Sequence, residues 1–178
     1  ARPPDSTCTP AAAGAGVRLV PLSGEHAAFV CRLYADPQVM RHLGGPRDEA
    51  SAAALVRQAL AASRDGSVQR LWIILDSATR APIGVAGLTR KDNTETELGL
   101  LLAGDRQARG HGQATIRALR TEAAGFAPGS FLVARHEPGN HAMARLLASL
   151  GFKPSPTSAD GTLCWRDPGN VGHKGCRS

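Results

Sequence analysis

The chain has 178 residues, and its 21 lysines and arginines against 15 aspartates and glutamates leave a formal net charge of +6. Hydrophobic residues make up 42% of the chain and charged residues 20%, which is too apolar and too weakly charged for a wholly disordered protein. No apolar run approaches the roughly 20 residues of a membrane span, and residues 1–10 lack the apolar stretch of a signal peptide. We therefore expect one soluble, cytoplasmic domain without membrane contacts.

The four cysteines form no Cys-x-x-Cys pair, so the sequence suggests no disulfide framework and no metal site. The arginines are spread along the chain, and aromatic residues are only 4% of it, which leaves little material for stacking on nucleic-acid bases. We expect no nucleic-acid partner, and a small polyanionic ligand fits the charge better. Nonspecific nucleic-acid binding is a less favoured alternative that predicts steep salt dependence.

The composition divides the chain into three parts. Residues 1–16 are rich in Pro, Ala and Gly and are predicted to be a flexible leader. Residues 17–166 are expected to form a single domain, and residues 167–178 a polar tail.

The first half of the domain predicts a strand followed by three helices. Residues 17–20 alternate like a short strand, and the apolar spacing within 22–33 predicts a first helix. Asp36 is suited to cap a second, brief helix that begins at Pro37. Asp48 can cap a longer helix, which should end near the Asp-Gly pair at 65–66.

The second half predicts three strands, a helix, a strand, a helix and a last strand. In chain order these cover residues 71–75, 83–89, 97–102, 116–126, 131–134, 143–150 and 162–166. Short polar turns separate the three strands, so an antiparallel meander is the simplest pairing.

The segment with the clearest chemical meaning, Gln107 to Ala114, has the sequence QARGHGQA and lies between a predicted strand and a predicted helix. Gly110 and Gly112 leave no side chain between the backbone and a ligand. Backbone N–H groups at a helix N-terminus attract an anion. Taken alone, a Gly-x-Gly segment is first interpreted as a glycine-containing strand-to-helix turn without a ligand.

This segment resembles the pyrophosphate-binding motif of the GNAT superfamily of N-acetyltransferases, Gln/Arg-x-x-Gly-x-Gly/Ala, with Gln107, Gly110 and Gly112 at the matching positions. A Rossmann motif fits less well, because the glycines are too few and the preceding strands predict a meander. A P-loop is excluded because Gly-Lys-Ser/Thr is missing.

A second segment is similar to the same superfamily. The helix that follows Asn140 ends in Leu150-Gly151-Phe152, as does the Asn-led helix of the family. The resemblance implies that Asn140 contacts the pantetheine arm of the cofactor. By itself, Asn140 would be interpreted as an ordinary helix cap.

The resemblance covers residues 17–165 and implies a mixed, mostly antiparallel central sheet flanked by helices, with a splayed strand pair for acetyl-CoA, the cosubstrate. Within the superfamily, the sequence is most similar to the branch of ribosomal-protein alanine/serine and polyamine acetyltransferases. The implied activity is acetyl transfer to a primary amine, either a peptide N-terminus or a small amine, and a homodimer is left open. The implied cofactor residues are Leu102, Ala103, Gly104, Gln107, Ala108, Arg109, Gly110, His111, Gly112, Gln113, Ala114 and Asn140.

Acetyl transfer requires a neutral amine, and Glu97 is the first candidate for the general base. Glu95 lies on the same strand face by period two, and either glutamate could be a solvated strand residue instead. At pH 7 a lysine amine with a pKa of about 10.4 is neutral in about one molecule in a thousand or fewer, whereas an α-amine with a pKa near 8 is neutral in roughly a tenth. An α-amine therefore needs less help from the base.

Two features depart from the family. The spacing from Glu97 to Gly110 is long and would require a β-bulge near Ala103. The positions where relatives place an acidic Tyr or Ser hold Leu147 and Met143, so no general acid is inherited. Tyr34, the only tyrosine, is interpreted as a packing or substrate-side residue. A noncatalytic acyl-CoA-binding module is therefore the alternative function.

Overall fold

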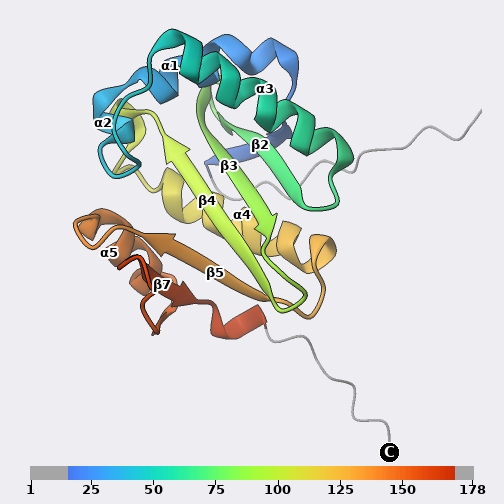
Figure 1. The fold of residues 1–178 in the computed structure, drawn as a ribbon, viewed down its shortest axis with the longest axis vertical. Coiled ribbons are helices and arrows are strands. Elements are labelled where there is room, and N and C mark those ends of the chain that lie inside the picture. The colour runs from blue at the N-terminus through green and yellow to red at the C-terminus, as the bar shows by residue number, and fades with distance from the viewer. Residues whose placement is uncertain (1–15, 171–178) are drawn as a thin grey trace, which may run out of the picture.

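The computed structural model describes residues 16–170, which form a seven-stranded sheet flanked by helices (Figure 1). Apart from Gly16 and residues 167–170, the predicted leader and polar tail lie outside the described residues. Among residues 16–170, no helix is both long and apolar enough to cross a membrane.

The observed elements follow the predicted order with one addition, β6. The strands are β1 (Val17–Pro21), β2 (Gln69–Asp76), β3 (Pro82–Arg90), β4 (Glu95–Leu102), β5 (Phe131–His136), β6 (Lys153–Ser155) and β7 (Leu163–Arg166). The α-helices are α1 (Ala27–Ala35), α2 (Pro37–Met40), α3 (Glu49–Asp65), α4 (His111–Phe126) and α5 (His141–Ser149). Short 3-10 helices η1 (Gly24–His26), η2 (Gly104–Arg106) and η3 (Pro168–Asn170) complete the described chain.

The strand order is β1-β2-β3-β4-β5-β7-β6, and the neighbouring strands pair antiparallel except for β4 and β5, which are parallel. The pairing of β4 with β5 ends at Leu98 and Ala134. Beyond that pair, β4 continues to Leu102 and β5 to His136 without bonding to each other. The predicted mixed, mostly antiparallel sheet is confirmed, and its two central strands separate toward their C-terminal ends.

Local capping explains where the early helices begin and end. Asp36 Oδ1 accepts hydrogen bonds from the Gln38 and Val39 amides at 2.8 and 3.3 Å, with Pro37 as the first residue of α2. Asp48 accepts from the Ser51 amide at 2.8 Å and caps α3, which ends at a glycine with φ +65°. Both predicted caps are confirmed.

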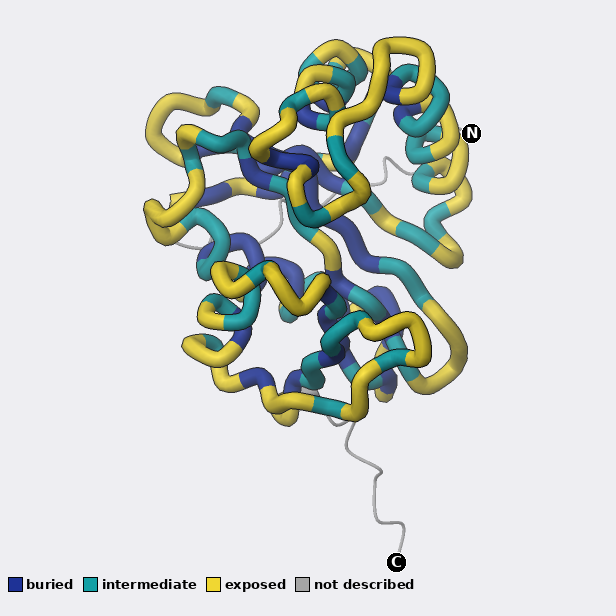
Figure 2. Tube along the Cα trace, turned by 60° about the vertical axis from the view of Figure 1, so that its left-hand side comes forward, coloured by how far each residue is buried: buried dark blue, intermediate teal, exposed yellow. Residues whose placement is uncertain are grey.

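Each face of the sheet carries its own hydrophobic core. Helices α4 and α5 cover one face, where Ile116, Leu119 and Leu147 pack against strand residues such as Leu88 and Leu98. On the other face, α1, α2 and α3 cover β2 and β3 and contribute a second set of core residues, which includes Val30, Leu33, Val39 and Val56. Figure 2 shows buried chain through the strands and exposed chain in the loops.

The prediction of a β-bulge near Ala103 is wrong. β4 pairs with β3 in continuous register from Thr96 opposite Arg90 to Leu102 opposite Gly84. The Ala103 amide then donates to the Ile83 carbonyl at 2.9 Å, which extends the ladder by one bond. The extra residues form η2 instead, so the added length lies in a turn after the strand.

Strand β6 was not predicted, because the segment is short and contains Pro154. Proline has no amide hydrogen to donate, and within sheets it is confined mainly to edge strands. β6 is such an edge strand and pairs only with β7.

Asp76, at the end of β2, connects the β2–β3 turn to the loop before α4. Its Oδ1 accepts from the Ala78 and Thr79 amides at 2.8 and 3.1 Å. Its Oδ2 lies 3.6 Å from both Arg106 Nη1 and His111 Nε2, and His111 Nδ1 donates to the Arg106 carbonyl at 3.2 Å. The Thr79 and Ala78 amides are the main causes that lower the pKa of Asp76, with His111 and Arg106 adding to them against the effect of burial.

This arrangement predicts a pH-dependent contribution to stability. The pKa of Asp76 is lowered in the folded protein, so the ionised carboxylate stabilises the fold. This contribution to stability is complete above the ordinary aspartate pKa of about 3.9 and is lost as the pH falls through the lower pKa of the folded state. We expect Asp76→Asn to be less stable than the wild type in chemical unfolding near neutral pH, with a difference that shrinks steadily toward acid. Asp105→Asn removes an exposed carboxylate of η2 that pairs with the same Arg106, with Oδ2 3.2 Å from Nε, and because exposed ion pairs contribute little it should stay close to the wild type throughout. A difference for Asp76→Asn that does not change with pH would contradict this role.

Candidate active site

The separation of β4 from β5 opens a cavity of about 760 Å³ between them. Its wall is built by β4, the loop before α4, the end of β5, α5 and the segment around α2. The lining residues are Gln38, Val39, Arg41, His42, Leu43, Glu97, Leu98, Gly99, Leu100, Leu101, Leu102, Gln107, Ala108, Gly110, Gly112, Gln113, Ala134, Arg135, His136, Asn140, Ala142, Met143, Arg145 and Leu146.

One end of this cavity is formed by the N-terminus of α4. Gly110 is the N-cap residue, with φ +82°, and provides no capping side chain. The first backbone N–H groups of a helix have no partner within the helix, and they carry part of its positive dipole. Ala108, also in the wall, has a positive φ of 59° that is uncommon for a residue with a side chain. This end of the cavity is therefore suited to an anion.

Gly112 allows the start of α4 to approach α5 closely. A Cβ atom at this position would lie 2.9 Å from Leu146 Cδ2. Any larger residue would require Leu146 to move, and Leu146 itself lines the cavity. The glycine thus sets the distance between the two helices that border the site.

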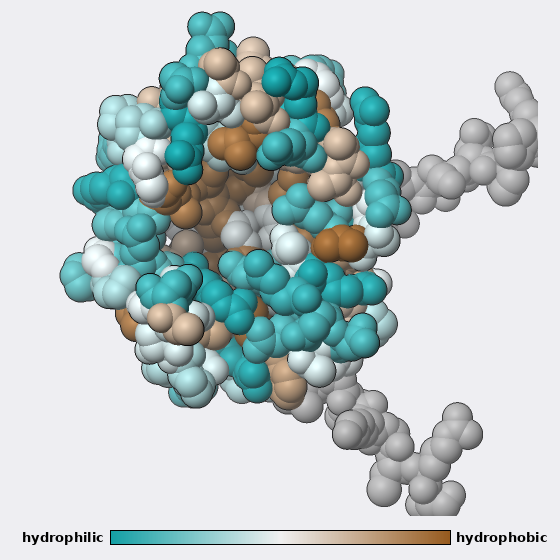
Figure 3. All heavy atoms as spheres, viewed as in Figure 1, coloured by the Kyte–Doolittle hydropathy of each residue, from teal (hydrophilic) through white to brown (hydrophobic). Residues whose placement is uncertain are grey.

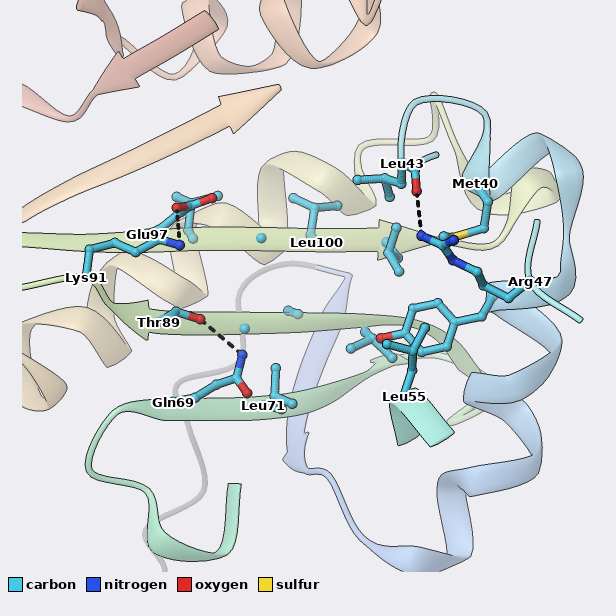
Figure 4. A pocket seen from close by; sticks show the side chains of 17 residues that line it. Met40, Leu43, Arg47, Leu55, Gln69, Leu71, Thr89, Lys91, Glu97 and Leu100 are labelled. Atoms are coloured by element: carbon cyan, nitrogen blue, oxygen red, sulfur yellow. Dashed lines mark hydrogen bonds and ion pairs between the residues drawn. The ribbon is translucent and has the colours of Figure 1, made fainter. Parts of the chain in front are cut away.

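A second cavity of about 370 Å³ lies on the sheet face covered by α1 and α3. Figure 4 shows its floor on β2, β3 and β4, with Glu97 and Lys91 at one end and Arg47 at the other. Leucines and Met40 line much of the wall between these ends, and Figure 3 shows a hydrophobic hollow on the face of the molecule seen in Figure 1. The two cavities share Leu43 and residues 97–101 of β4.

Glu97 lies at the border of the two cavities and is held by two cations. Its Oε2 is 3.0 Å from Lys91 Nζ and accepts from Arg135 Nη1 at 2.9 Å. The other guanidinium nitrogen of Arg135 donates to Glu95 at 2.8 Å, which confirms that both glutamates lie on one face of β4. Only Glu97 of the two lines the cavities.

Most of the predicted cofactor residues meet at the larger cavity. Those in its wall are Leu102, Gln107, Ala108, Gly110, Gly112, Gln113 and Asn140. Ala103 instead packs with the second core, and Gly104 lies close to the side chain of Gln38. Arg109 is exposed in the loop, His111 faces Asp76 and Ala114 is buried in the first core.

Asn140 fits both of its sequence-based interpretations. Its Oδ1 accepts from the Met143 amide at 3.1 Å and so caps α5. The same residue lines the cavity, where its amide nitrogen is available as a donor.

The sequence did not indicate several residues of the site. Arg135 and His136 come from the end of β5, and Arg41 and His42 from the turn after α2. The His136 ring is fixed by two hydrogen bonds, because its Nε2 accepts from Trp165 Nε1 at 2.9 Å and its Nδ1 donates to the Glu137 carbonyl at 2.7 Å. For Arg135 and His136, the available signal was their position directly after the strand predicted over residues 131–134. Arg41 and His42 offered no such signal.

Neither of the two candidate positions for a general acid, 147 and 143, holds a residue that can donate a proton. Leu147 is fully buried, and Met143 lines the larger cavity. Tyr34 lines the second cavity, and its pKa is raised chiefly by burial and further by Cys31, so its hydroxyl is neutral and can donate a hydrogen bond. Within residues 16–170, no group of three or more His, Cys, Asp or Glu side chains is placed to hold a metal ion.

Solved structures with the same fold include acetyltransferases of several kinds. The acetyltransferase from Agrobacterium tumefaciens is 24% identical, with a TM-score of 0.75 over 94% of this chain and 99% of that one. A Salmonella typhimurium acetyltransferase that modifies the N-terminal serine of ribosomal protein L7/L12 is 13% identical, with a TM-score of 0.75 over 88% and 97%. Spermidine N-acetyltransferase from Vibrio cholerae, in complex with CoA and spermine, is 13% identical, with a TM-score of 0.71 over 85% and 93%. At these identities the likeness shows the fold.

No curated protein sequence matches the chain. The family model of the acetyltransferase (GNAT) domain, however, matches residues 17–153, which is most of the described domain. This match agrees with the separated β4–β5 pair and with the glycine loop at the start of α4. The chain therefore belongs to the GNAT acetyltransferase family.

Proposed function

We propose that the protein is an acetyl-CoA-dependent N-acetyltransferase that acts on a primary amine, with the cosubstrate bound between β4 and β5. The observation that carries this proposal is the meeting of two cavities at β4, one of which ends at the uncapped N-terminus of α4. One cavity is suited to the acyl donor and the other to the acceptor. The shared fold with Vibrio cholerae spermidine N-acetyltransferase, solved in complex with CoA and spermine, supports a reaction between an acyl-CoA and an amine.

Residues of the larger cavity suit the pyrophosphate, the pantetheine arm and the thioester of acetyl-CoA. The amides at the start of α4 suit the pyrophosphate, and the exposed side chains of Arg41 and Arg145 add positive charge at the wall. The apolar side chains of Met143 and Leu146 and the Asn140 amide suit the pantetheine arm. Beyond Leu98, the edge of β4 that faces β5 has no strand partner, so backbone N–H groups there can polarise the thioester carbonyl.

Electrostatics in the second cavity favours an acceptor with few positive charges. In the wall formed by described residues, the charged side chains are Arg47, Lys91 and Glu97. Glu97 is already paired with Lys91 and Arg135, whereas Arg47 has no ion pair with another described residue. A polyamine would therefore find no free carboxylate in this wall, and a single α-amine fits better.

Glu97 is the proposed general base of the reaction. One of its carboxylate oxygens is held by Lys91 and Arg135, which fixes the side chain at the border of the two cavities. The other oxygen can accept a proton from the amine, directly or through a water molecule. An α-amine, of which roughly a tenth is neutral at pH 7, needs less help from this base than a more basic alkylamine does. The departing thiolate can take its proton from water.

Binding of CoA is tested at Ala108, which faces the cavity and is exposed. Ala108→Asp adds a negative charge beside the proposed pyrophosphate site, and Ala108→Asn adds a neutral side chain of the same shape. Both residues tolerate a positive φ. We expect calorimetry to show affinity for CoA about tenfold or more lower for the Asp variant than for the Asn variant. Equal affinities would contradict the proposed position of the pyrophosphate.

The role of Glu97 is tested by Glu97→Gln with Glu95→Gln as the matched control. Both substitutions remove a carboxylate that binds Arg135, but only Glu97 borders the cavities. Thiol release should show kcat/KM about 100-fold lower for Glu97→Gln, while Glu95→Gln retains most of its activity. Equal losses in the two variants would assign the effect to the ion-pair network and not to a base.

The choice of acceptor is tested with alaninamide and spermidine as substrates. The charges of the second cavity predict a higher kcat/KM for alaninamide, and they predict that Arg47→Gln improves the turnover of spermidine. Preference for spermidine by the wild-type protein would overturn the proposed acceptor class. It would leave the acetyl-CoA-dependent reaction in place.

A noncatalytic acyl-CoA-binding module is the second candidate, and the apolar residues at the acid positions favour it. Leu147 and Met143 offer no proton for the leaving thiolate. Binding of CoA without thiol release from acetyl-CoA across a broad panel of amines and peptides would support this candidate over the enzyme.

A further inference from the structure

Gly99 has an unusual position for a glycine. It lies in β4, a strand with neighbours on both sides in the seven-stranded sheet, yet it is exposed. It directly follows Leu98, the last residue of β4 that pairs with β5, and on its other side it pairs with Gly87 of β3. Glycine inside a strand weakens the sheet, because it has no side chain to pack and loses more chain entropy on folding.

The fold itself does not require a glycine at this position. Gly99 is not among the glycines with a positive φ, and a Cβ atom built on it would meet no atom within 4 Å. The glycines of β3 differ, since a Cβ at Gly84 would lie 2.2 Å from the Leu101 carbonyl oxygen and one at Gly87 would lie 2.5 Å from Leu71 Cδ2. A larger residue at position 84 would clash with the backbone, and one at position 87 would displace the Leu71 side chain, whereas Gly99 borders open space.

That open space is where the two cavities meet. Gly99 lines both of them, and its neighbours on the same strand face are Glu97 and Leu101. Alternate residues of a strand are about 6.7 Å apart, so the Cα atoms of Glu97 and Leu101 are about 13 Å apart, with no side chain between them on this face. Any side chain at position 99 would project into the space between them.

We propose that Gly99 is a specificity-determining residue, which keeps open the passage through which the acceptor amine reaches the acyl thioester. This inference rests on the proposed function. The absence of a side chain sets the room available for substituents next to the amine nitrogen. Acceptors that are branched at the neighbouring carbon depend on this room more than unbranched ones.

Gly99→Ala and Gly99→Leu test the proposal through three measurements: the melting temperature, the affinity for CoA, and kcat/KM with glycinamide and valinamide. We expect an unchanged or higher melting temperature in both variants, and an unchanged affinity for CoA in Gly99→Ala, whose added methyl group is small. We expect kcat/KM to fall by about 100-fold for Gly99→Leu. For Gly99→Ala the loss of kcat/KM should be smaller than for Gly99→Leu. Within the Gly99→Ala variant, the loss should be larger for valinamide than for glycinamide.

Gly125→Ala is the matched control. Gly125 lies in α4 and also borders open space, but it lines neither cavity. This variant should keep its activity toward both amines.

The outcomes separate this inference from the proposed function. Turnover by Gly99→Leu at the wild-type rate would overturn the inference alone. So would a loss of CoA affinity or of melting temperature in Gly99→Ala that parallels its loss of activity, because the glycine would then serve the cofactor or the fold. A wild-type protein that neither binds CoA nor releases thiol would overturn the proposed function, and the inference with it.

Discussion

The separation of β4 from β5 after Leu98 and Ala134 is the constraint on which the rest of the site depends. Two parallel strands that stop pairing leave backbone donors and acceptors without partners, which a buried sheet cannot tolerate unless a ligand or water satisfies them. The cavity of about 760 Å³ occupies this gap. The loop before α4, the end of β5, the start of α5 and the exposed Gly99 all border the same opening.

Contacts between residues that are far apart in sequence hold the two sides of the gap in place. Asp76, on the β2–β3 side, contacts Arg106 and His111 and so supports the loop at the start of α4. Gly112 lets that helix approach Leu146 of α5. On the acceptor side, Lys91 and Arg135 hold Glu97 at the border of the cavities. The geometry of the site thus depends on contacts that cross the sheet and on an ion-pair network more than on the glycine motif alone.

Features with local causes could be predicted from the sequence. The caps at Asp36 and Asp48 depend on amides a few residues away, and the period of the strands placed Glu95 and Glu97 on one face. The partners of Glu97 could not be predicted, since Arg135 is 38 residues away and meets it only through the β4–β5 pairing. The bulge near Ala103 was wrongly predicted because an added turn after the strand and a bulge within it give the same spacing from Glu97 to Gly110. β6 was not predicted because it is short and contains Pro154, and a proline argues against a strand except at the edge of a sheet.

The most direct test of this account is a crystal structure of the protein grown with CoA. We expect CoA between β4 and β5, with its pyrophosphate at the amides that begin α4 and its thiol near Gly99. CoA bound elsewhere on the molecule, or a gap without CoA at saturating concentration, would contradict the central claim that the separated strands form the acyl-donor site.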